Sequence, residues 1–183
     1  MIDPLLSRAI SVACALLLLL AAWHKVAARE SFRIALGEYR LLPAALLRPA
    51  SVLLPGLEAT LGLAWLAGYG PGAVALLTAA LLATYAAAIA LNLWRGRVHI
   101  SCGCGFGGIS GDDQPLSWWL VARNLVLGTV AVLATLPATS RDLGPYDWLT
   151  LALALLAFGV LYSGASQLMR NGAAIASWRE QRD

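Results

Sequence analysis

Long uncharged runs of hydrophobic residues make up most of the chain. A helix needs about 20 apolar residues to cross the hydrocarbon core of a bilayer. Runs of about that length cover residues 9–26, 50–67, 73–93, 116–136 and 148–169. The second and third runs are separated only by the Gly-rich turn 68–72, which predicts a helical hairpin. The pattern therefore predicts an all-α, polytopic membrane helical bundle of about five transmembrane helices, forming a single domain over residues 1–183.

Two segments near the N-terminus need a separate interpretation. Met1-Ile2-Asp3-Pro4 lacks the positive charge of a signal peptide, so we expect the first span to be retained. Residues 28–49 space four arginines among apolar residues, which is typical of an amphipathic helix lying at the membrane interface. A solvated basic loop is the alternative. We favour the interfacial segment because the apolar residues recur with a helical period.

Composition agrees with the membrane class. The chain is 60% hydrophobic and 13% charged, with a mean hydropathy of +0.72, whereas a soluble domain is roughly half apolar and about one quarter charged. The formal charge of +3 is spread over loop ends rather than gathered in a stripe. We therefore expect the lipid bilayer, and no nucleic acid, as a partner.

The loop at residues 94–115 contains the most informative motif, Cys102-Gly103-Cys104. Glycine supplies the backbone angles that so small a disulfide ring would need, and a strained disulfide is readily exchanged. Cys102 and Cys104 are therefore candidate catalytic cysteines. A metal-transfer pair and a pair without chemistry are the alternatives. Two thiolates are too few for a closed zinc site, so no resident metal is predicted.

Several polar residues fall inside or at the ends of the predicted spans, where charged groups are costly and are functional candidates. Their depths are all measured from the face that carries the cysteine loop, because successive helices alternate in direction. A buried Glu58 should have a cationic partner, and the candidates are Lys25, Arg123 and His24. Cys14 lies in an apolar run and is expected to pack as a small hydrophobe. The predicted supporting polar cluster is His24, Lys25, Glu58, Asn92, Arg123 and Asn124.

These motifs resemble a known family. His24-Lys25, Phe32, Leu-Pro-Gly-Leu-Glu at 54–58, Asn92 with Arg95-Gly96-Arg97, Cys102-Gly103-Cys104 and Arg123-Asn124 are similar, in this order, to the methylamine utilisation protein MauE family, which looks related to DoxX-like membrane proteins. The resemblance covers roughly residues 10 to 130. The chain departs from the family pattern as Cys-Gly-Cys-Gly-Phe-Gly instead of Cys-Gly-Cys-Phe-Gly, which leaves the thiol pair intact.

The resemblance implies a bacterial inner-membrane protein that forms or exchanges disulfides during maturation of the methylamine dehydrogenase small subunit. It further implies a periplasmic thioredoxin-like partner and a disulfide-containing client. Thiol oxidation would make the chain a thiol-disulfide oxidoreductase, and quinone is a candidate electron acceptor for it. A non-enzymatic assembly scaffold and a metal-handling membrane protein are the alternative functions.

Two arguments predict opposite orientations for the cysteine loop. Most Lys and Arg residues lie on the face that carries this loop, and the positive-inside rule would place that face in the cytoplasm. Disulfides are made and kept in the periplasm, which places the loop on the opposite side of the membrane. We expect a periplasmic loop, because arginines in an interfacial helix can be satisfied at either surface.

Overall fold

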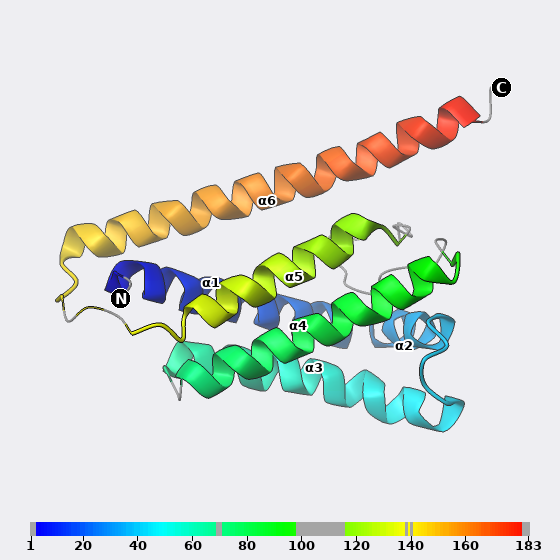
Figure 1. The fold of residues 1–183 in the computed structure, drawn as a ribbon, viewed down its shortest axis with the longest axis horizontal. Coiled ribbons are helices and arrows are strands. Elements are labelled where there is room, and N and C mark those ends of the chain that lie inside the picture. Colours follow the sequence, from blue (N-terminus) through cyan, green and yellow to red (C-terminus); the bar gives the residue numbers. More distant parts are fainter. Residues whose placement is uncertain (1–2, 69–70, 98–115, 138, 140, 181–183) are drawn as a thin grey trace. The chain divides into compact units, whose positions relative to one another are not determined.

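The structure is a computed structural model that describes residues 3–68, 71–97, 116–137, 139 and 141–180. All regular structure in these residues is helical (Figure 1). The helices are α1 (Pro4–Ala27), α2 (Arg29–Glu38), α3 (Ala44–Ala67), α4 (Pro71–Trp94), α5 (Trp118–Leu133) and α6 (Pro145–Glu180). The predicted all-α fold is confirmed.

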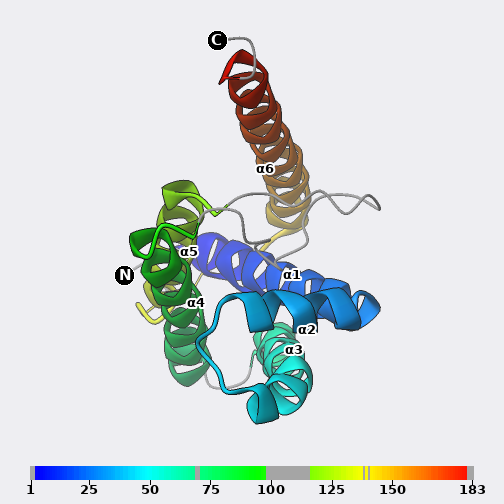
Figure 2. The same cartoon turned by 90° about the vertical axis from the view of Figure 1, so that its right-hand side faces the viewer.

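The chain divides into two compact units, Met1–Arg141 and Asp142–Asp183. In the first unit α1 packs mainly against α3, α4 packs mainly against α5, and α2 lies against α3 (Figure 2). The second unit contains the single long helix α6. The helices of the first unit build the candidate site described below.

Among the described residues, three helices are long and apolar enough to cross a membrane, namely Pro4–Ala27, Ala44–Ala67 and Gly72–Trp94. Two shorter apolar helices, Trp118–Leu133 and Pro145–Leu161, add to them. Large apolar side chains such as Leu53, Leu63 and Leu76 point out of the protein with more than half of their surface exposed. Such an exposed apolar surface is suited to lipid, and the protein is a polytopic helical membrane protein.

Small residues and a few polar contacts hold the transmembrane helices together. A Cβ atom on Gly62 of α3 would lie 2.8 Å from Leu19 Cγ of α1, so the glycine allows these helices to approach closely. Across the α3–α4 hairpin, Trp65 Nε1 donates a hydrogen bond of 3.0 Å to Thr78 Oγ1. Cys14 is partly buried against the same apolar core, as a small hydrophobe would be.

The predicted interfacial segment 28–49 is divided between two helices. α2 ends at Glu38, and α3 begins at Ala44, several residues before the predicted start at residue 50. Pro43 has the extended backbone of an N-cap residue. Pro49 and Pro55 lie inside α3, which is tolerated in membrane helices because other groups can satisfy the freed carbonyls. Apolarity alone underestimated the length of this helix, because Arg48 and Pro49 interrupt the uncharged run within its first two turns.

Candidate functional site

A buried ion pair joins α1 to α3. Lys25 lies in the last turn of α1, and its Nζ is 2.5 Å from Oε1 of Glu58, in the middle of α3. The two side chains are only 4% and 1% exposed. A charge buried among apolar helices is destabilising unless it is paired. Of the three partners considered for Glu58 on sequence grounds, the structure therefore selects Lys25.

Two aromatic residues complete the surroundings of this ion pair. Tyr85 of α4 donates a hydrogen bond of 2.9 Å to the same Oε1 of Glu58. The ammonium group of Lys25 lies 5.3 Å from the centre of the Tyr85 ring and 5.6 Å from the centre of the Phe32 ring of α2. Both distances permit cation–π attraction, which is stronger where water is excluded. We call Lys25, Phe32, Glu58 and Tyr85 the buried cluster.

The buried cluster connects four helices and leaves one acceptor available. Oε1 of Glu58 receives both Lys25 and Tyr85, whereas Oε2 is buried and has no hydrogen-bond partner among the described residues. Buried polar atoms normally have a partner, and an exception calls for a specific explanation. A carboxylate oxygen in this position can accept a hydrogen bond or a proton from a bound molecule.

Tyr85 is a functional candidate that the sequence reasoning missed. Its signal was a phenol in the middle of the apolar run 73–93, because a buried tyrosine hydroxyl usually finds a hydrogen-bond partner. The predicted α3–α4 hairpin placed that run next to Glu58. The two observations together would have predicted the contact.

The other four predicted polar residues lie on α1, α4 and α5. Asn92 of α4 and Asn124 of α5 are fully buried, and each amide donates to the carbonyl one turn earlier in its own helix. Among the described residues, no hydrogen bond joins either asparagine to Glu58. Arg123 is half-buried on α5, and His24 is exposed on α1. The structure joins Lys25 to Glu58, and the grouping of all six residues into one supporting cluster stays a prediction.

The predicted catalytic cysteines, Cys102 and Cys104, lie outside the described residues, so their pairing stays a prediction. The segment that contains them connects the end of α4 to the start of α5. Those two helix ends lie at the same end of the first unit as α2 and the end of α1 (Figure 1). This agrees with the expectation that the cysteine loop and the charged ends of these helices share one side. The described residues contain no group of three or more His, Cys, Asp or Glu side chains that could hold a metal ion.

Comparisons with known proteins identify the family. The model of the family "Methylamine utilisation protein MauE" matches residues 3–137. The chain is 40% identical to methylamine utilization protein MauE of Paracoccus denitrificans over 134 residues, which cover 72% of this chain and 69% of the relative. It is 33% identical to that of Methylorubrum extorquens, covering 96% of this chain and 89% of the relative. It is 36% identical to that of Paracoccus versutus, covering 91% and 88%. No solved structure matches. The chain therefore belongs to the methylamine utilisation protein MauE family.

Proposed function

We propose that this protein is a membrane accessory factor of methylamine utilisation that exchanges disulfide bonds with exported proteins through Cys102 and Cys104. The observation that carries the proposal is the family match over residues 3–137, which includes the Cys-Gly-Cys motif. The matching relatives are named for methylamine utilisation. A client rich in disulfides, such as the small subunit of methylamine dehydrogenase, suits this chemistry, with a periplasmic thioredoxin-like protein as intermediary.

The proposed exchange transfers two electrons from a client dithiol to the cysteine pair. A client thiolate attacks one sulfur of the Cys102–Cys104 disulfide, forms a mixed disulfide and releases the other cysteine as a thiolate. The second client thiolate then attacks the mixed disulfide, which leaves the client oxidised and both cysteines reduced. Reoxidation of the pair returns two electrons and two protons to a membrane quinone, which becomes a quinol.

The buried cluster supports this proposal by supplying a polar, protonatable site inside the membrane. Glu58 Oε2 is buried without a partner among the described residues, and Tyr85 supplies a hydroxyl group beside it. Intramembrane ionisable residues are typical of proton relays. In the proposed cycle the cluster accepts protons released when the thiols are oxidised. The cysteine loop is then on the periplasmic face of the bacterial inner membrane, where disulfides persist.

The experiment combines thiol labelling with a test of client maturation in intact cells. A membrane-impermeant maleimide is applied before and after reduction to the wild type, to the Cys102→Ser/Cys104→Ser variant and to a Cys14→Ser control. We expect the wild type to react only after reduction, and the double variant to lose both this reaction and the disulfides of the client. The control should behave like the wild type, because Cys14 is packed against the apolar core.

Two results would contradict the proposal. Normal disulfide formation in the client of the double variant would favour the scaffold function, in which the bundle only recruits its partner. Labelling that needs permeabilised membranes and no reduction would place free thiols in the cytoplasm.

A further inference from the structure

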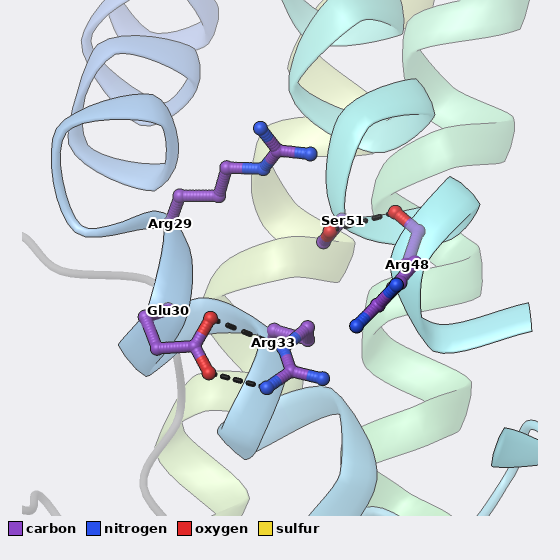
Figure 3. Close-up of a pocket in the computed structure, with 5 residues that line it drawn as sticks. All are labelled: Arg29, Glu30, Arg33, Arg48 and Ser51. Atoms are coloured by element: carbon purple, nitrogen blue, oxygen red, sulfur yellow. Dashed lines mark hydrogen bonds and ion pairs between the residues drawn. The ribbon is translucent and has the colours of Figure 1, made fainter.

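A second polar site lies between α2 and the first turns of α3. It is a cavity of about 460 Å³, lined by Arg29, Glu30, Arg33, Arg48 and Ser51 (Figure 3). Three guanidinium groups face one carboxylate there, which leaves an excess of positive charge. None of these residues belongs to the buried cluster or to the cysteine motif. The volume is within the range of small-molecule sites.

The arginines are placed on the cavity from two different helices. Arg29 and Arg33 are four residues apart on α2, so they share one face of that helix. Arg48 reaches the same space from the second turn of α3, and Figure 3 shows its guanidinium group pointing back toward α2. The buried hydroxyl of Ser51 donates a hydrogen bond of 2.7 Å to the carbonyl oxygen of Arg48, which anchors the backbone of this turn.

Glu30 forms an ion pair with only one of the three arginines, Arg33. Its carboxylate accepts hydrogen bonds from Nε and Nη2 of Arg33, a two-point pairing that holds this guanidinium in place. The hydrogen bond from Arg33, followed by the charges of Arg33, Arg48 and Arg29, lowers the pKa of the Glu30 carboxyl below its usual value. Arg29 and Arg48 form no ion pair with any described residue. Two guanidinium groups therefore remain available to an anion.

The surroundings of the cavity indicate where such an anion comes from. α2 and the start of α3 link two helices that are long enough to cross the membrane. Apolar side chains are exposed on α2, on the connection to α3 and on the first turn of α3, at Ile34, Leu42 and Leu46 respectively. Arginines beside exposed apolar residues at the end of a transmembrane helix lie at the depth of lipid headgroups. Basic pockets between such helices commonly bind phosphate-containing headgroups.

We propose that Arg29, Arg33 and Arg48 form a binding site for a phosphate group, and that an anionic phospholipid is the source that the position favours. Guanidinium groups match phosphate oxygens in a two-point geometry. In the proposed complex Arg29 and Arg48 contact the phosphate from opposite sides, and the Glu30-bound Arg33 contributes its remaining N–H donors. The site ties the interfacial helix α2 to a lipid, and it is independent of the thiol chemistry.

The test uses native mass spectrometry of the full chain in detergent, with phosphatidylglycerol, phosphatidylcholine or inorganic phosphate added separately. The variant is Arg29→Gln/Arg48→Gln. The matched control is Arg40→Gln/Arg95→Gln, which removes the same charge from exposed positions outside the cavity. We expect one phosphatidylglycerol to remain bound to the wild type and to the control. Affinity should fall about twenty-five-fold in the variant, because each of the two arginines near an anionic headgroup contributes roughly a fivefold gain.

The three possible outcomes distinguish a lipid site, a soluble-phosphate site and no site. Loss of phosphatidylglycerol in the variant alone, with little phosphatidylcholine bound to any form, supports the lipid site. Binding of inorganic phosphate by the wild type and the control but not by the variant, without selective lipid retention, would support the phosphate site and assign it to a soluble ligand. Equal binding by the variant and the control in every arm would overturn the proposal, and thermal unfolding of both forms shows whether a loss reflects misfolding.

Discussion

Removing the charge of Lys25 should leave the Glu58 carboxylate buried in the bundle without a cationic partner. The Lys25→Met substitution keeps a side chain of similar length but removes the ammonium group that lies 2.5 Å from Glu58 Oε1. Because Glu58 is only 1% exposed, water cannot replace the lost partner. The variant should therefore be destabilised through the charge that remains and not through lost volume.

The magnitude follows from the contacts of Glu58. Breaking a fully buried pair by removing one partner costs about 3–5 kcal/mol. The hydrogen bond from Tyr85 remains and offsets about 1 kcal/mol. We expect the free energy of unfolding to fall by about 2–4 kcal/mol. In the double variant Lys25→Met/Glu58→Gln the buried charge is gone while an acceptor for Tyr85 is kept, so the loss should be about 1 kcal/mol or less.

The assay is reversible unfolding in mixed detergent micelles, measured by circular dichroism. It compares the wild type, Lys25→Met, Glu58→Gln and the double variant. The control is Asp3→Asn, which removes the charge of an exposed ion pair with Arg141 but keeps an N-cap acceptor. It should change stability by no more than about 1 kcal/mol. The reasoning is refuted if Lys25→Met costs no more than this control, or if the double variant loses the sum of the two single variants.

Further predictions concern the helix contacts and the interfacial helix. Gly62→Ala should cost about 1–3 kcal/mol in the same unfolding assay, because its Cβ would lie 2.8 Å from Leu19 Cγ. The matched Gly128→Ala would meet only ordinary contacts of 3.7 Å or more, so it should be neutral or slightly stabilising, and equal costs for the two variants would refute this explanation. Tyr85→Phe should cost about 1–2 kcal/mol, less than Lys25→Met, because it removes a hydrogen bond and keeps the ring. The hydrogen bond from Arg33 lowers the pKa of the Glu30 carboxyl below its usual value, so the stabilisation from this pairing should be present above that usual value and lost as the pH falls through the lower folded pKa. An NMR titration that finds the pKa of Glu30 at or above the usual value for glutamate would contradict this.

The sequence predicted that Glu58 needs a cationic partner, but it did not predict which residue that partner is. The need of Glu58 for a cationic partner followed from its place in an apolar run, since a lone buried charge is costly. Which cation pairs with it depended on how α1, α3 and α5 are rotated about their axes. The contact selects Lys25, leaves His24 exposed and keeps Arg123 half-buried. Helix rotation is decided by side-chain packing over long sequence separations, which a hydrophobic pattern does not specify.

The sequence by itself determined the class of the protein, because the length and apolarity of its helical runs admit few structures other than a membrane bundle. It also determined the approximate positions of the helices, the α3–α4 hairpin and, through the order of its motifs, the family. Only the tertiary structure decided that Tyr85 and Phe32 join the Lys25–Glu58 pair and that Arg48 faces Arg29 across a cavity. Each of these contacts joins residues of different helices, and each depends on how those helices are rotated about their axes. Many similar apolar sequences could pack with other rotations.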